Sequence, residues 1–387
     1  MNIMNIWNKI KIIFINFKEL GLIGSATGIT GIIGALFWLF LASVIGTEDY
    51  GKVSYYLAVA IIASRISLIG SPNTIMVYSS KGEKIQPPIF FITLIGAIVT
   101  SLILFFVFLF DVSISIYVIG FVVFTLVTSD LLAKKRFKNY AKFIISQKIL
   151  LVVLALTLNH IYGINGVILG IAISFLPYSI IIFKEFTKEK IDFGLIKKNS
   201  RFIINSYVLD LSVTFNGTLD KIIMLPILGF VLLGNYQLGM QFFSLLTIIP
   251  VIFFQYLLPR DSRAESNIKF RKILIIFSVI LAILGSIAAP RLIPVLYSQF
   301  NEAIIVIQIV SFAIIPYTIV IIFMSKFLGN EKSIFALIGS LIFLAIQIPL
   351  IVILGEIWDL EGVSISIVIA YSIQALILFI MTKKFHI

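Results

Sequence analysis

The sequence predicts an all-α integral membrane protein of about twelve transmembrane helices, arranged as two homologous six-helix lobes. Sixty per cent of the residues are hydrophobic, 12% are charged, and the mean hydropathy is +1.12, which excludes an ordinary soluble domain. Apolar runs long enough to cross a bilayer recur along the whole chain. Landmarks of its first half also return, in the same order, in its second half.

The predicted spans are apolar runs of roughly 20 residues, the length that a helix needs to cross a bilayer. They cover residues 20–45, 52–71, 87–110, 112–133, 142–160, 163–183, 202–224, 235–258, 272–290, 302–326, 333–354 and 361–382. The sequence Gly70-Ser71-Pro72-Asn73 is expected to break the second helix near its cytoplasmic end.

Two matched landmarks predict an internal duplication. Ile45, Gly46 and Gly51 correspond to Leu228, Gly229 and Gly234 at one constant offset along the chain. The stretch 162–167 resembles the stretch 358–363 at a slightly larger offset. We therefore predict an N-terminal lobe at residues 1–190 and a C-terminal lobe at residues 191–387.

Basic residues predict the orientation. With twelve spans, 26 of the 30 lysines and arginines fall in loops on one side, and the exceptions are Lys52, Arg65, Lys221 and Arg291. The positive-inside rule then places both termini in the cytoplasm of a multi-pass protein of the cell membrane. The net charge of +12 is explained by this topology and by anionic lipids, so no nucleic-acid partner is expected.

The pattern of reactive residues favours a function other than catalysis. The chain has no cysteine and only two histidines, and it lacks phosphate-binding, paired-carboxylate and nucleophile-elbow motifs. We expect no enzyme activity, no metal site and no cofactor.

Polar residues inside the spans are the candidate site, because a charge at bilayer depth is costly and is usually functional. Arg65 lies about 21 Å below the outer turn at 1.5 Å per residue, and it either faces a cavity or extends toward the inner head groups. Asp210 is the acidic counterpart and a candidate for ion coupling. The seventh span carries the polar stripe Ser206, Asp210, Thr214 and Gly217, with Asn205, Ser212 and Asn216 beside it.

Such a polar helix must line water or another polar helix; a structural hydrogen-bonded interface is the alternative. Gln237 and Gln241 add a polar stripe to the eighth span. Lys52, Asp220 and Lys221 are expected to be solvated helix ends. In the first span, Gly21, Gly24, Gly28, Gly31 and Gly34 share one face; we expect this face to serve helix packing, with a bendable helix as the alternative.

The stretch from Phe40 through Tyr55 resembles the first hairpin of polysaccharide and O-antigen flippases of the multidrug/oligosaccharidyl-lipid/polysaccharide exporter superfamily. The stretch from Asp220 to Tyr236 resembles the family's second-half turn, and Gly362-Val363 resembles the entry to its last helix. The resemblance covers essentially the whole chain.

This resemblance implies two lobes related by a pseudo-twofold axis along the membrane normal, with a central cavity that opens alternately to either side. It also implies an oligosaccharide on a polyprenyl diphosphate as the substrate, moved to the outer leaflet, with polysaccharide assembly proteins as candidate partners. Arg65 suits a diphosphate, which guanidinium groups bind well.

Three alternatives follow from the same reading. A multidrug exporter driven by a proton or sodium gradient is the first, and Asp210 supports it. The lipid II flippase class is disfavoured, because two additional spans are not seen. A membrane polysaccharide polymerase or ligase is disfavoured, because those enzymes carry a sizeable outer loop and the sequence predicts no such loop here.

Overall fold

The fold is known from a computed structural model, which describes residues 3–108, 111–179, 191–261, 268–330 and 332–385. Within these residues the elements are helices and there is no strand. The last residues of the predicted spans 87–110 and 163–183 lie outside these ranges. Three lysines of the loop between the halves, Lys184, Lys188 and Lys190, also lie outside them.

The helices are α1 (Ile3–Val44), α2 (Thr47–Leu68), α3 (Ser71–Ser80), α4 (Gln86–Val107), α5 (Val112–Ala133), α6 (Phe137–Ile173), the 3-10 helix η1 (Leu176–Tyr178), α8 (Gly194–Lys198), α9 (Ser200–Asn216), α10 (Leu219–Asp261), α11 (Ile268–Leu296), α12 (Ala303–Gly329) and α13 (Ser333–Lys384).

The helices account for the predicted number of spans. In the described part of the chain, eight helical segments are long and apolar enough to cross a membrane, and α2 with α3 forms a ninth span bent by 40°. Three of the eight contain a break in helical geometry, at Gly163, at Gly229 and at Trp358–Asp359. Dividing these three at their breaks and counting the bent pair as one span gives twelve within the described ranges. The all-helical membrane fold is therefore confirmed.

The break between α2 and α3 lies where the sequence predicts it. Gly70 adopts a left-handed backbone conformation with φ 68°, and α3 begins with Ser71 and Pro72. A proline suits the first turn of a helix because its missing N–H has no partner there. The result is that the short helix α3 begins at the bend, with Asn73 and Thr74 in its first turn.

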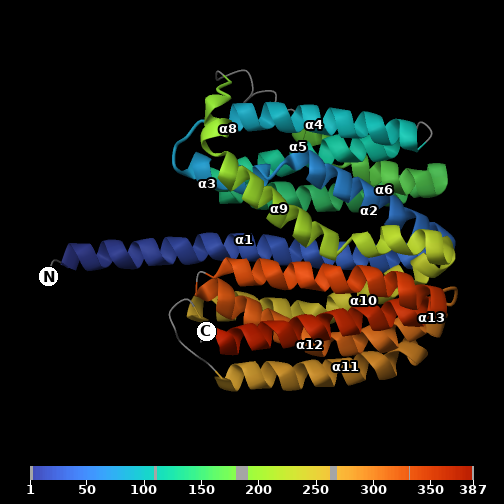
Figure 1. The fold of residues 1–387 in the computed structure, drawn as a ribbon. Coiled ribbons are helices and arrows are strands. Elements are labelled where there is room, and N and C mark those ends of the chain that lie inside the picture. The colour runs from blue at the N-terminus through green and yellow to red at the C-terminus, as the bar shows by residue number, and fades with distance from the viewer. Residues whose placement is uncertain (1–2, 109–110, 180–190, 262–267, 331, 386–387) are drawn as a thin grey trace. The chain divides into compact units, whose positions relative to one another are not determined.

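Two compact units make up the chain: unit 1 is Met1–Phe37 with Ala60–Asp210, and unit 2 is Trp38–Val59 with Leu211–Ile387. In unit 1, α4 packs against α5 and α5 against α6, as Figure 1 shows for the cyan and green helices. In unit 2, α12 packs against α10, α11 and α13. The division into lobes at residues 190 and 191 concerns duplication, and it stays a prediction.

The same turn ends a helical hairpin in each half of the chain. Gly163 has φ 59° and ψ −144°, and Asp359, its counterpart in the second half, has φ 46° and ψ −128°. Shortly after each turn, a glycine lies against the helix that precedes the turn. A Cβ atom on Gly166 would overlap the carbonyl oxygen of Leu158, and one on Gly362 would overlap that of Leu354. The turn, the glycine and the contacted carbonyl all match at one constant offset, as a duplication requires.

A reciprocal contact joins the two copies of the first landmark inside unit 2. A Cβ atom on Gly51 would overlap the carbonyl oxygen of Phe230 and lie 3.0 Å from the backbone nitrogen of Gly234. A Cβ atom on Gly234 would overlap the carbonyl oxygen of Thr47 and lie 3.2 Å from the nitrogen of Gly51. The matching residues are separated by the same offset in both cases, so α2 and α10 meet through equivalent surfaces.

Most of the described glycine face of α1 has no close neighbour within unit 1. A Cβ atom on Gly24, Gly28 or Gly31 would have no described atom within 4 Å, whereas one on Gly34 would lie 3.0 Å from Cε of Lys148. Close helix packing, which small residues usually permit, is therefore absent at these three positions within the described residues.

Candidate functional site

The candidate site in unit 1 is built where α9 crosses the bend between α2 and α3. Gly70 allows this approach, because a Cβ atom there would lie 2.6 Å from the carbonyl oxygen of Ile203 and 2.8 Å from the nitrogen of Tyr207. Tyr207 also donates a hydrogen bond from its hydroxyl to the carbonyl oxygen of Ile66, at 3.3 Å. The backbone of the first half of α9 therefore packs directly against the bend between α2 and α3.

Asp210 is held at this contact by an amide. Nδ2 of Asn73 donates a hydrogen bond to Oδ1 of Asp210, at 3.2 Å. A carboxylate at bilayer depth needs such partners, because it leaves water at a large cost in free energy. Asn73, at the start of α3, and Asp210, near the middle of α9, thus form a polar link between two segments far apart in sequence.

Two further polar contacts extend the link toward the ends of the same helices. Glu83 follows α3, and its carboxylate accepts hydrogen bonds from Nζ of Lys198 at 3.3 Å and from Nδ2 of Asn199 at 3.2 Å. Lys198 is largely exposed, so this ion pair contributes little by itself. We use the name inner contact for the four hydrogen bonds of Asn73, Tyr207, Lys198 and Asn199, together with the backbone approach at Gly70.

Arg65 lies on α2 one turn before the bend, and its guanidinium group is close to an aromatic ring. The guanidinium carbon is 5.4 Å from the ring centre of Phe121. Nε is buried without a hydrogen-bond partner, and no ion pair joins Arg65 to any residue that the structure describes. The Arg65 charge acts on Asp210 only at longer range. The cation–π contact offsets only part of the cost of removing the guanidinium group from water. Arg65 is therefore a cation inside a span without an anion at contact distance.

The structure brings some predicted site residues together and separates others. Arg65 and Asp210 both belong to unit 1 near the bend, although no ion pair joins them in this conformation. Asn205, also in unit 1, is exposed and does not take part in the inner contact. Thr214, Asn216, Gln237 and Gln241 belong to unit 2. The side-chain oxygens of Asn216 and Gln237 are buried without a hydrogen-bond partner among the described residues.

Sequence reasoning missed Asn73 and Tyr207 as members of the site. Asn73 was visible only as the last residue of a helix break, and Tyr207 is an aromatic residue among apolar neighbours. A signal did exist, because Ile203, Tyr207 and Asp210 recur at spacings of four and three and so share one face of α9. This face shares Asp210 with the stripe that sequence analysis identified.

Asp220 is not the solvated helix end that sequence analysis expects. It is 4% exposed. Its Oδ2 accepts a 2.6 Å hydrogen bond from the hydroxyl of Tyr236, and its Oδ1 lies 3.3 Å from Nζ of Lys221. The reason is the hairpin turn at Gly229, which folds Tyr236 back onto Asp220. Lys52, by contrast, pairs at the surface with Glu48 at 2.7 Å.

Lys148 falls inside the predicted span 142–160, although the count of loop charges includes it. It lies about three turns beyond the start of α6, inside a single segment that runs from Phe137 to Tyr178 and qualifies as a membrane span. The helix begins earlier than predicted because Lys138 and Lys142 are compatible with a helix end that leaves the bilayer. One basic residue of the orientation count therefore lies within an apolar helical segment.

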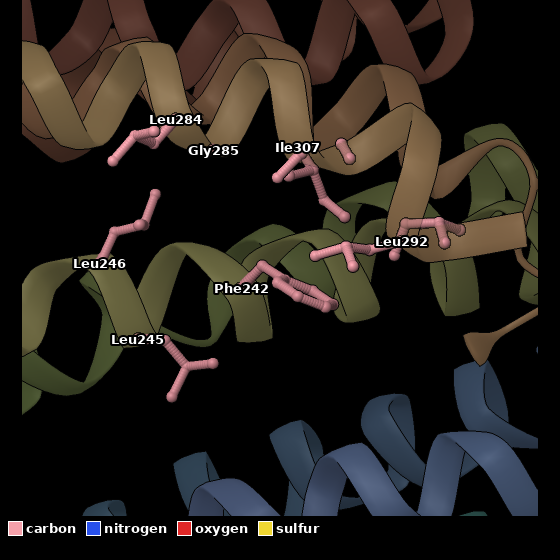
Figure 2. Close-up of a pocket in the computed structure, with 10 residues that line it drawn as sticks. Phe242, Leu245, Leu246, Leu284, Gly285, Leu292 and Ile307 are labelled. Atoms are coloured by element: carbon pink, nitrogen blue, oxygen red, sulfur yellow. The ribbon is translucent and has the colours of Figure 1, made fainter. Parts of the chain in front are cut away.

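A separate pocket in unit 2 has a volume of about 250 Å³ and lies between α10, α11 and α12. Figure 2 shows the side chains of Leu246 and Leu284 pointing toward one another across it. All of its lining residues are apolar or glycine, and no predicted site residue is among them. The pocket suits hydrocarbon and offers no group that recognises a charged or sugar ligand.

The fold is an all-helical membrane fold with broken spans. No family model and no curated protein sequence matches the chain. Solved structures do. A lipid II flippase MurJ in an inward closed conformation superposes with a TM-score of 0.74 at 14% identity, over 94% of this chain and 87% of that one.

Two MATE transporters give similar results. An inward-facing multidrug resistance MATE family transporter of the MOP superfamily superposes with a TM-score of 0.69 at 13% identity, over 92% of this chain and 94% of that one. A mutant of the MATE transporter VcmN of Vibrio cholerae gives a TM-score of 0.60 at 14% identity, over 95% and 97%. At such low identities these matches establish only that the chain shares the fold of these structures. They do not separate lipid flippases from multidrug exporters.

Proposed function

We propose that this protein is a flippase that moves a polyprenyl-diphosphate-linked oligosaccharide from the cytoplasmic to the outer leaflet by alternating access. The fold is that of MurJ and of MATE transporters, and both groups are transporters by name. Within that class, a lipid-linked anion accounts best for the charges inside the spans of unit 1. Both termini are cytoplasmic in this proposal, as the loop charges predict.

The observation that carries the proposal is Arg65. It is a cation in a membrane span, one turn from a helix bend, with an aromatic ring beside it and no ion pair to a described residue. An arginine kept unpaired at that depth has a large cost in solvation free energy unless an anion arrives during function. A diphosphate fits, because its oxygens accept the parallel hydrogen bonds of a guanidinium group.

The inner contact supplies the moving part. It consists of four hydrogen bonds and one close backbone approach at Gly70, beside the edge-to-face contact of Tyr78 with Phe202, so a small number of interactions holds it closed. In the described conformation Asp210 bonds to Asn73. In our proposal, Asp210 pairs with Arg65 in another state that closes the cytoplasmic side, and the substrate diphosphate displaces it.

A cation-coupled multidrug exporter is the second candidate. It is favoured by Asp210, a carboxylate inside a span that accepts a hydrogen bond from a neutral amide. Such a group can exchange a proton or a sodium ion as the contact opens. In that case transport depends on an ion gradient and fails in Asp210→Asn, while Arg65→Ala retains it.

The experiment that tests the flippase is polysaccharide export in cells that lack their own flippase. Arg65→Ala should abolish export at an unchanged level of protein in the membrane. Arg65→Lys should restore part of it, since it supplies the charge without the planar fork. Arg291→Ala is the matched control, because Arg291 is exposed and belongs to unit 2. Full export by the Arg65→Ala variant would refute the proposal.

Charge reversal tests the pairing of Arg65 with Asp210. Export should be lost in Arg65→Asp and in Asp210→Arg, and it should return in part when the two are combined. Losses that simply add in the double variant would reject the pairing, because contacting residues give non-additive effects. The control is Asp220→Asn combined with Arg65→Asp, where no recovery is expected.

A further inference from the structure

Lys148 is a charged residue inside unit 1 that the inner contact does not use. It lies about three turns into α6, which corresponds to about 16 Å of helix at 1.5 Å per residue. It is partly buried, and no hydrogen bond or ion pair joins it to another residue of the described ranges. Among the described residues of unit 1, Lys148 is therefore a second cation, besides Arg65, that lies in a span and forms no ion pair.

The tip of Lys148 lies against α1. A Cβ atom on Gly34 would lie 3.0 Å from Cε of Lys148 and 3.3 Å from its Nζ. Gly34 is close to the middle of the candidate span Leu22–Val44. A lysine that only anchored its helix would extend toward the aqueous end of α6. The ammonium instead lies at the centre of a neighbouring span, where it is most costly.

The face of α1 next to this lysine is open. Gly31, one turn from Gly34 toward the N-terminus, and Gly28 beyond it have no described atom within 4 Å of an added Cβ position. The glycine at position 34 thus leaves room for the ammonium, and the absence of side chains at 31 and 28 leaves a path along the helix. At these two positions no described side chain of unit 1 fills the space beside the helix.

We propose that Lys148 is a second anion-binding residue, which contacts the diphosphate of the transported lipid from α6 while Gly34 keeps its ammonium accessible. This inference rests on the proposed function, which was argued without Lys148. A diphosphate carries more than one negative charge, so it matches two separate cations better than one. An ammonium group suits this role because it binds a phosphate as a point charge from any direction.

The test is a binding measurement on the purified full-length protein in nanodiscs of a neutral phospholipid. The ligand is a long-chain polyprenyl diphosphate, and the variants are Lys148→Met, Lys148→Arg, Gly34→Leu and Gly31→Leu. Lys148→Met is close in shape and removes only the charge. Gly34→Leu fills the space of the ammonium, and Gly31→Leu places the same side chain on the open part of the helix.

We expect Lys148→Met and Gly34→Leu to weaken binding about tenfold or more, which is the loss expected for a hydrogen bond to a charged group. Lys148→Arg should bind within about threefold of the wild type, and Gly31→Leu, which fills part of the open face, should weaken binding less than Gly34→Leu. An equal excess of phosphatidylglycerol should not compete. If it does compete, the residue binds phospholipid head groups and the assignment to substrate is overturned.

The outcomes separate this inference from the proposed function. If the wild type binds the diphosphate and Lys148→Met binds equally well, the role of Lys148 is refuted while the flippase stands. If the wild type does not bind it, both are refuted. Because Gly34→Leu can perturb folding, the decision rests on Lys148→Met, with thermal unfolding showing that this variant is as stable as the wild type.

Discussion

Gly51 of α2 and Gly234 of α10 pack against each other's helices through equivalent backbone atoms. Gly51 lies on the carbonyl oxygen of Phe230, and Gly234 lies on that of Thr47. Because the two contacts are related by the same offset along the chain, α2 and α10 meet here through equivalent positions. No side chain larger than hydrogen fits at either position.

The first prediction concerns this pair. Gly51→Ala and Gly234→Ala should each lower the free energy of unfolding by about 1–3 kcal/mol, because the added methyl group overlaps backbone that cannot turn aside. Thermal unfolding of the purified protein measures the effect. The double variant should lose less than the sum, since one shift of the helices relieves both overlaps. Gly31→Ala is the control and should be neutral or stabilising, because it adds a methyl group in open space on a helix.

The second prediction concerns the inner contact. Ile203 is 5% exposed where it meets Gly70, and the chain has no natural cysteine, so Ile203→Cys reports opening by its rate of thiol labelling. Asn73→Ala should raise that rate about five- to tenfold in purified protein, which corresponds to one lost hydrogen bond. Asn139→Ala, at an exposed site, should leave it unchanged. Equal rates in all three backgrounds would mean that Asn73 does not hold α9 closed.

The third prediction concerns a buried ion pair in unit 2. Arg271 of α11 donates to Oδ1 of Asp261 of α10, and the hydroxyl of Ser325 donates to Oδ2 of Asp261 at 2.6 Å. Arg271→Met leaves the carboxylate without its cation, and it should cost about 3–5 kcal/mol of unfolding free energy. Thermal unfolding checks this value. Lys269→Met, at an exposed position on the same helix, should change stability by less than about 0.5 kcal/mol.

Much of the fold could be predicted because it depends on hydrophobic runs and on glycines in obligatory places. The breaks at Gly163, Gly229 and Asp359 coincide with the predicted turns, since a chain that reverses between two apolar helices needs polar or glycine residues there. The bend at Gly70 and Pro72 was predictable for the same reason. Each of these signals is local in the sequence.

The site could be predicted only in part, because its contacts join segments far apart in the chain. Arg65 and Asp210 are identifiable by charge alone. The partner of Asp210 is Asn73, 137 residues away, and no local pattern distinguishes that asparagine from other polar residues at a helix break. Asp220 was misplaced because charge suggests solvent, whereas the turn at Gly229 brings Tyr236 back onto its carboxylate.

The fourth prediction concerns orientation. Single cysteines at Glu48 and Ile357, both exposed, should react with an impermeant thiol reagent added to intact cells, and one at Asp192 should react only after the membrane is permeabilised. The cysteine-free wild type is the control for background labelling. Labelling at position 192 from outside would reverse the topology that the loop charges predict.

The central claim is that the chain carries a lipid-linked diphosphate across the bilayer with Arg65 as an anion-binding residue. The most direct measurement is transbilayer movement of a polyprenyl-diphosphate-linked oligosaccharide in vesicles that contain only the purified protein. The account predicts that wild-type vesicles move the lipid far faster than protein-free vesicles, and that vesicles with Arg65→Ala do not exceed the protein-free rate. Movement by the Arg65→Ala variant at the wild-type rate, or no movement by the wild type, would contradict it.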